Sequence, residues 1–420
     1  MPKKRETKLE NHQQHIAQQI QEFFANLQTG DTGWESVFQI LQSLTLQLTD
    51  EIEQSLRIQF LENSPLQLSV EKLLDSVSES LTRAQKINIK LRLGRDYEKL
   101  GAWDKALDTY KSLIELCDSS EFNDRKAEAL RWAGHIHSMR NNWQEALTLY
   151  QDSLDVCLKN SNQPGEAQAY NSLGILYFEQ GEFGNATSYW KKGLELADSL
   201  DEIKLTAKIY NNLGALANAQ GHPKEALAYY GESVPRFEKI GNNRGLAETF
   251  HNMAMSYFDL NSWLEAGEYY EKSYLLAKEI GDVRLQATIK LNRVKLYLTI
   301  RDWLIAEALC NQALRTYLHL EDRLGEAEVY KFLGVVYTMK TEWNKAKSHF
   351  VDSIQLLKQF KSLLSEAEAH LEYGRMWLKK NNPKSARKQF EQALKLFTKV
   401  NAVKEIENVK EEIAKLPLQE

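Results

Sequence analysis

The chain has 420 residues, of which 43% are hydrophobic and 26% charged, and its formal net charge is −5. No apolar run approaches the roughly 18 residues that a membrane-crossing helix needs. The charge balance argues against a globally basic nucleic-acid binder. Polar residues follow the start at Met1-Pro2-Lys3-Lys4-Arg5, so we expect no secretory signal. Three cysteines offer no even disulfide framework, which predicts a reducing, cytoplasmic setting.

Residues 1–82 form a section rich in Gln, Leu and Glu, for which we predict helices. The first is an amphipathic helix closed by Gly30, with apolar positions Ile16, Ile20, Phe23, Phe24 and Leu27. A second is expected from about Trp34, and a third after Pro65. Two interpretations are open for this section. It is either a cap covering the exposed end of the region after residue 82, or a regulatory or dimerising bundle.

After this section an alanine recurs every forty residues, eight times, without insertion or deletion. The eight are Ala106, Ala146, Ala186, Ala226, Ala266, Ala306, Ala346 and Ala386. Eight hits in one register predict eight copies of one structural unit, which we number one to eight.

Residues around each alanine repeat as well. Twelve residues earlier stand Gly94, Gly134, Gly174, Gly214, Ala254, Val294, Gly334 and Gly374. Four residues later stand Tyr110, Tyr150, Trp190, Tyr230, Tyr270, Cys310, Phe350 and Phe390. Spacings of four and seven mark one helix face, and aromatics nine residues before most of the alanines mark a second helix. Turn signals such as Gly181, Gly221 and Asn381-Asn382-Pro383 separate the two, so the unit is predicted to be a helical hairpin.

The third copy resembles the tetratricopeptide repeat family, through Tyr170, Leu173-Gly174, Tyr177, Ala186 and Trp190. The forty-residue step is similar to that of the long-repeat branch, found in Pins-type scaffolds, kinesin light chains and Rap-type peptide receptors. The resemblance implies an all-α fold, a right-handed α-solenoid of eight hairpins over residues 83–398. Copy six, with Val294 and Cys310, matches the pattern poorly, which makes it a candidate ligand position or flexible joint.

Residues 399–420 are predicted to hold a capping helix and a tail. Val403, Ile406, Val409 and Ile413 lie at helical spacing among Lys and Glu residues. Such a helix would cover the last hairpin with its apolar face and keep its charged face in water.

The resemblance implies that the first helix of each hairpin lines the concave side and contacts the ligand. The positions that packing leaves free lie fifteen, fourteen and eleven residues before each alanine. Their candidate binding residues are Asn171, Asn211, Asn212, His251, Asn252, Asn292, Lys295, Lys331, Arg92, Arg95, Arg131 and His135. Asparagine can pair with a peptide amide through both a donor and an acceptor, and the cations would attract carboxylates. Alternatively, the asparagines bond to backbone or to one another.

Motifs for chemistry are missing from the sequence: it has no phosphate-binding loop, no paired-cysteine metal motif and no nucleophile elbow. We therefore expect a non-enzymatic adaptor that binds an extended peptide or disordered segment in the concave groove. The alternative is a peptide-gated regulator in which residues 1–82 are switched by occupancy of the groove. We expect no cofactor, no metal, no nucleic acid, no membrane insertion and no small-molecule ligand. An enzyme would need an active-site cluster, for which His135 beside Arg95 and Arg131 is the one candidate.

Overall fold

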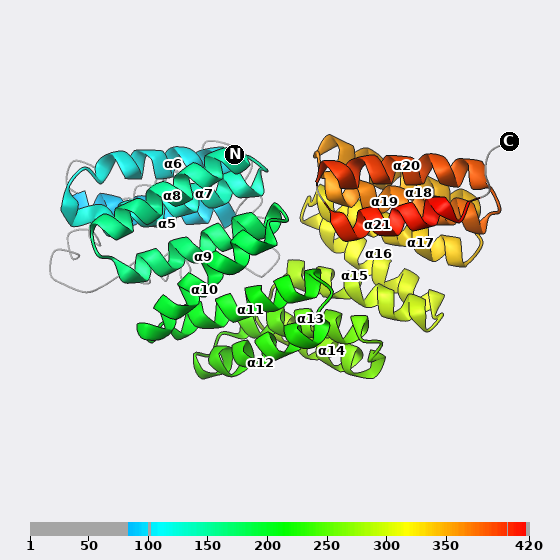
Figure 1. Cartoon of the computed structure of the whole chain (residues 1–420), viewed down its shortest axis with the longest axis horizontal. Helices are drawn as coiled ribbons and strands as arrows, with labels where there is room; N and C mark the ends of the chain where they lie inside the picture. The colour runs from blue at the N-terminus through cyan, green and yellow to red at the C-terminus, as the bar shows by residue number, and fades with distance from the viewer. Residues whose placement is uncertain (1–82, 100–101, 401, 417–420) are drawn as a thin grey trace, which may run out of the picture. The chain divides into compact units, whose positions relative to one another are not determined.

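The computed structural model describes residues 83–99, 102–400 and 402–416, so the predictions for residues 1–82 lie outside the described residues. Every regular element in these ranges is a helix (Figure 1). The helices are α5 (Arg83–Lys99), α6 (Trp103–Leu116), η2 (Ser120–Phe122), α7 (Asn123–Met139), α8 (Trp143–Lys159), α9 (Gln163–Glu179), α10 (Phe183–Ser199), α11 (Ile203–Ala219), α12 (Pro223–Lys239), α13 (Asn243–Asp259), α14 (Trp263–Glu279), α15 (Val283–Thr299), α16 (Trp303–His319), α17 (Arg323–Met339), α18 (Trp343–Gln359), α19 (Leu363–Lys379), α20 (Pro383–Lys399) and α21 (Val403–Ala414). None of them is long and apolar enough to cross a membrane.

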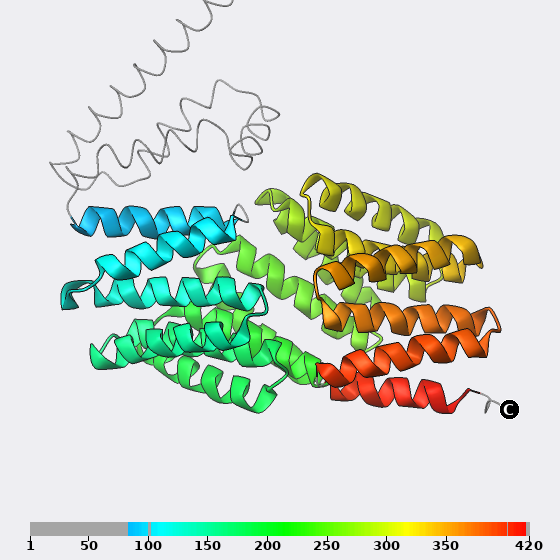
Figure 2. The ribbon, with the colours of Figure 1, turned by 90° about the horizontal axis from the view of Figure 1, so that it is seen from above.

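The helices pair as the repeat predicts, two to a copy, from α5 and α6 in copy one to α19 and α20 in copy eight. From copy two onward, each first helix packs most closely on the second helix of its own copy, and each second helix packs on the next first helix (Figure 2). Successive first helices, such as α9, α11 and α13, also contact each other directly. The all-α solenoid of hairpins is therefore confirmed, and its first helices form one continuous layer.

Each hairpin closes over its repeat alanine, which is fully buried in all eight copies. In most copies a glycine on the first helix lies under an aromatic ring of the second. A Cβ at Gly214 would come within 2.4 Å of Tyr230 Cε1, so only glycine leaves room for this ring. In copy six, Val294 and Cys310 take these two places, and both are fully buried in one apolar cluster. Copy six thus departs from the pattern at two positions that compensate for each other. A larger residue than glycine stands on its first helix, and a smaller residue than an aromatic stands opposite on its second helix.

Turns recur every twenty residues and explain the constant helix length of seventeen residues from α7 to α20. At each turn one residue has positive φ, such as Gly181 (φ 76°), Gly221 (φ 80°) or Thr341 (φ 61°). The following residue donates its N–H to the carbonyl five residues back, as Glu182 does to Tyr177 at 2.8 Å. This is the Schellman arrangement, which satisfies the last carbonyls of a helix.

The last hairpin is covered by α21. Val409 of this helix is fully buried, and Leu416 beyond it is 6% exposed. Both belong to the apolar cluster that contains Phe390 and Phe397 of α20. The predicted capping helix is therefore present. The three cysteines, Cys117, Cys157 and Cys310, are buried free thiols.

Candidate functional site

The free positions of the first helices form one surface, which we call the first-helix face. Its members in copies three to six are tied together by side-chain hydrogen bonds that follow a single rule. A residue fifteen before the alanine of one copy bonds to the residue fourteen before the alanine of the next. Asn212 Nδ2 donates to Asn171 Oδ1 at 3.0 Å, and Asn252 Nδ2 donates to Asn211 Oδ1 at 3.2 Å. His251 Nε2 and Asn292 Nδ2 are 3.0 Å apart. We call these three the amide pairs.

Each of the two asparagine pairs leaves hydrogen-bonding capacity unused. In the Asn211 and Asn252 pair, the Asn252 amino group donates the hydrogen bond and the Asn211 carbonyl oxygen accepts it. The Asn252 carbonyl and the Asn211 amino group have no further partner among the described residues, and both side chains are half-buried. A pair therefore presents one acceptor and one donor, which is the complement of a peptide main chain.

The third pair differs because it contains an imidazole. His251 is only 8% exposed, and its Nδ1 atom is covered and has no hydrogen-bond partner among the described residues. Burial, followed by the positive charge of Lys295, lowers the pKa of His251 to about 4. Lys295 itself is exposed, with Nζ 5.9 Å from the centre of the Phe332 ring. At neutral pH this pair is therefore uncharged, like the two asparagine pairs.

Beyond the amide pairs, the cations of copies seven and eight are already neutralised. Lys331 is 6% exposed, and its Nζ lies 2.7 Å from Glu328 and 2.6 Å from Glu368. Burial alone would lower the pKa of Lys331, but the two carboxylates outweigh it and raise the pKa well above its usual range. Lys331 was predicted to attract ligand carboxylates, and the structure places it instead in an internal ion-pair network.

At the other end of the face the cations lack such partners. Arg92 and Arg95 are exposed on α5, and the Arg95 guanidinium lies 4.9 Å from the centre of the Trp132 ring. Arg131 of α7 is half-buried with no ion pair among the described residues, and burial lowers its pKa. His135 lies 3.3 Å from Glu98, and burial lowers its pKa.

Sequence reasoning missed Lys204 and Lys208 on α11. Both are exposed and lie eight and four residues before Asn212, which puts them on the same helix face as the amide pairs. The candidate positions began at the middle of each first helix, and extending the helical spacing toward its start by one turn and by two turns finds Lys208 and Lys204.

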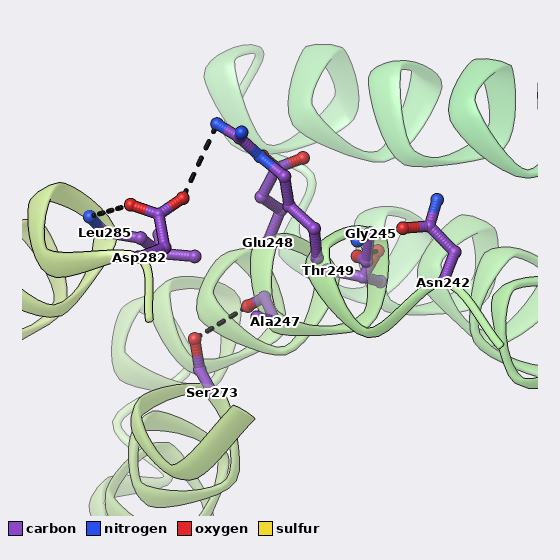
Figure 3. Close-up of polar contacts among 9 residues, drawn as sticks. Asn242, Gly245, Ala247, Glu248, Thr249, Ser273, Asp282 and Leu285 are labelled. Atoms are coloured by element: carbon purple, nitrogen blue, oxygen red, sulfur yellow. Dashed lines mark hydrogen bonds and ion pairs between the residues drawn. The ribbon is translucent and has the colours of Figure 1, made fainter. Parts of the chain in front are cut away.

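Copies five and six are also joined by a second set of polar contacts (Figure 3). Asp282 accepts a hydrogen bond from the Leu285 N–H at 2.9 Å, which caps α15, and also pairs with Arg244 of α13 at 3.6 Å. Inside copy five, buried Ser273 donates to the Ala247 carbonyl at 2.6 Å. These contacts connect α13 to α14 and to α15, the helices that carry the third amide pair and the second helix between them.

The described part of the face offers binding groups and no assembled catalytic centre. Within the described residues no three His, Cys, Asp or Glu side chains are grouped to hold a metal ion. The His135 imidazole is engaged by Glu98, and its cationic neighbours provide no nucleophile. The arrangement therefore suits recognition, with hydrogen bonds at its centre and positive charge toward its amino-terminal end.

Helical hairpins in a forty-residue register with a continuous first-helix face define a tetratricopeptide-type repeat protein. The tetratricopeptide repeat family model matches residues 85–159 and 165–239, the first four copies. Copies one to four are therefore tetratricopeptide repeats, and copies five to eight continue the same register. A comparison with curated proteins finds no match.

Among solved structures, the fold is similar to Rap proteins. The Rap conjugation regulator of plasmid pLS20, solved with the Phr* peptide, shares 12% identity at a TM-score of 0.57, covering 76% of this chain and 97% of that one. A Rap protein complexed with Competence and Sporulation Factor shares 14% identity at 0.55, covering 78% and 98%. A signal transduction ATPase from Pyrococcus horikoshii with a tetratricopeptide repeat sensor shares 15% identity at 0.54, covering 92% and 66%. At these identities the likeness concerns the fold.

Proposed function

We propose that this protein is a non-enzymatic interaction scaffold that binds an extended peptide or a disordered protein segment along its first-helix face. The observation that carries the proposal is the row of amide pairs. Three uncharged pairs follow one spacing along the face, and the two asparagine pairs offer unused donors and acceptors. An extended main chain has the complementary periodic N–H and C=O groups.

The comparisons support a peptide partner. Two Rap structures with the same fold were solved in complexes, one with the Phr* peptide and one with Competence and Sporulation Factor. Each hydrogen bond contributes about 0.5–1.5 kcal/mol net, so the pairs alone would hold a ligand weakly. Apolar side chains that flank the pairs, such as half-buried Phe178, Met255 and Phe258, would add contact area.

Selection from a random peptide library displayed on phage tests this proposal with the full chain as bait. Selected peptides are then measured against wild type and the double variant Asn211→Ala with Asn252→Ala, which deletes both members of one pair and leaves no single amide unpaired. We expect affinity to fall about tenfold or more, because two hydrogen bonds to the peptide are lost together.

The matched control is Asn311→Ala, which removes an exposed asparagine from second helix α16. It should leave binding unchanged. The double variant should also unfold at slightly lower temperature, because one bond between copies four and five is lost. Selected peptides that bind wild type and the double variant equally would refute the first-helix face as the binding site.

A further inference from the structure

Copies five and six expose large apolar side chains at the turns that lead from their first to their second helices. Leu264 of α14 and Leu304 of α16 are 76% and 77% exposed. Trp263, Ile300 and Ile305, which flank them in the sequence, are exposed as well. We call these five residues the turn patch. Single exposed leucines are common on protein surfaces, whereas a group of large apolar side chains marks a contact surface.

The other copies show that the fold does not need an apolar residue at the position of these leucines. Leu264 and Leu304 both stand two residues before the repeat alanine, near the start of the second helix. The same position in copies one to four, seven and eight is held by Asp104, Gln144, Gly184, Lys224, Asn344 and Lys384. Since none of these six is apolar apart from the glycine, packing of the hairpin does not explain two successive leucines.

Contacts between α14 and α15 bring the two turns together. These consecutive helices are joined by a short turn and run antiparallel, and a Cβ built on Gly267 would lie 3.8 Å from Leu296 Cδ2. Leu264 stands one helical turn before Gly267, and Ile300 stands one helical turn after Leu296, so these two residues lie across the same junction. Ile300 begins the turn that leads to Leu304. The turn patch therefore spans the junction between copies five and six.

Side chains of opposite charge border the turn patch at its two ends. Glu265 of α14 lies on the side of copy five, and Arg301, in the turn after α15, lies on the side of copy six. Both are exposed, and neither forms an ion pair among the described residues. In copy seven, by contrast, Lys345 holds the position of Glu265 and pairs with Glu342 at 2.7 Å. The turn patch thus has a carboxylate at one end and a guanidinium at the other, each available to a partner.

This distribution of charge makes the turn patch complementary to itself. A two-fold rotation about its centre exchanges the two ends, so that Glu265 of each chain faces Arg301 of the other. The apolar side chains of both chains meet between these charges. A patch with the same charge at both ends would instead repel its own image.

We infer that the turn patch joins two identical chains in a symmetric dimer, in which Leu264 and Leu304 are buried and Glu265 pairs with Arg301 of the second chain. An arginine and a carboxylate fix orientation as well as adding attraction. A lipid surface fits less well, because apolar surfaces that bind membranes are bordered by Lys and Arg, whereas exposed Glu265 and Glu268 border this one. The inference is independent of the proposed peptide binding, because none of the five residues belongs to the first-helix face.

Analytical ultracentrifugation of the full chain over a range of concentrations tests the inference, and wild type should form a reversible dimer. The double variant Leu264→Gln with Leu304→Asn introduces residues that copies two and seven carry at this position. It should raise the dimer dissociation constant at least about tenfold, because both chains lose apolar contact area. The control Leu275→Gln with Leu318→Asn makes the same change at exposed sites further along α14 and α16, and should dimerise like wild type. The thermal midpoint of the isolated monomer should be the same in both variants, because all four leucines are exposed.

Charge reversal tests the two-fold arrangement. Glu265→Arg and Arg301→Glu should each weaken the dimer, because like charges then face each other at both ends of the interface. An equimolar mixture of these two variants should form a mixed dimer, since every arginine of one chain then faces a glutamate of the other. Glutamate suits the backbone at position 301, where φ is 62°, because Glu321 has a φ of 52° in another turn of the array.

A wild type that stays monomeric at every concentration would overturn the inference, and so would a dimer that both leucine changes leave intact. Two charge-reversal variants that fail to associate on mixing would overturn the symmetric arrangement. A monomer that binds vesicles of phosphatidylserine, and loses this binding with Leu264→Gln and Leu304→Asn, would assign the turn patch to a lipid surface instead of a second chain.

Discussion

His251 stands, in copy five, at the position that asparagine holds in copies three and four. Its lowered pKa of about 4 has a consequence for stability. An unfolded histidine has a pKa of about 6.5, so protons bind the unfolded chain more tightly than the folded one. The stabilising contribution is complete above about pH 6.5 and is lost as the pH falls toward and through 4. It amounts to about 3 kcal/mol at most.

The variant His251→Asn should remove this acid sensitivity and keep the pair. An asparagine there can bond to Asn292 as Asn211 does to Asn252. We expect the thermal midpoint of wild type to fall further than that of the variant between about pH 7 and about pH 4.5. His319→Asn, at an exposed site on α16, is the control and should follow wild type. Parallel curves for His251→Asn and wild type would contradict the buried, neutral imidazole.

At the residue scale, sequence reasoning found the members of the amide pairs but could not tell how they bond. Asparagines fifteen and fourteen before each alanine were visible in the chain, and pairing along the row was one of two open interpretations. The bond between Asn171 and Asn212 depends on the offset of neighbouring helices, a property of packing rather than of spacing. One partner of Lys331, Glu368, was hidden for the same reason, because it lies one copy away. The other partner, Glu328, lies three residues earlier on the same helix, a spacing that the sequence shows.

At the scale of the element, the turns set the length of the helices, because each turn residue with positive φ ends one helix. Thr341 has φ of 61°, a conformation that is costly for a β-branched residue, and its side chain is exposed. We expect Thr341→Gly to stabilise the protein by about 1 kcal/mol, since glycine adopts this region freely. The rise should be visible in the thermal midpoint.

The matched change in the opposite sense is Gly181→Ala. A Cβ there would meet no atom within 4 Å and φ is 76°, so the added methyl group acts through the backbone alone. It should lower the midpoint by a similar amount. If Thr341→Gly lowered the midpoint, Thr341 would be making a contact that outweighs its backbone cost.

Helix pairs were the part of the fold most open to prediction. A buried alanine, a glycine and an aromatic ring recur because the two helices of every hairpin pack closely in the same way. In copy three, for example, the Trp190 ring lies against Gly174, where a Cβ atom would clash with it. Copy six was harder to interpret, because Val294 and Cys310 depart from the pattern together. Only the structure shows that both are fully buried and that one compensates for the other.

For the whole molecule, stability is a sum of hairpins and the joints between them, so an end can unfold without the middle. Val409 of α21 is fully buried against the last hairpin. Val409→Asp would bury a carboxylate with no partner, at a cost of several kcal/mol. We expect hydrogen exchange to speed up in α20 and α21 while α11 to α14 stay protected. Faster exchange throughout would show that the array unfolds as one unit.

Each amide pair takes one residue from a copy and the other from the next copy along the chain. In the proposed function, the unit that would contact a peptide is therefore the junction between two copies and not the single hairpin. Exchanging a whole hairpin for the corresponding hairpin of a related protein would change one member of the amide pair at each of its two junctions. Both junctions would then hold a new combination of residues. A single crossover in a turn separates the members of only one pair, whereas a crossover between the residues fifteen and fourteen before an alanine separates the members of two. Crossovers that alter specificity one step at a time should accordingly fall in the turns, which are also where the chain tolerates a break most easily.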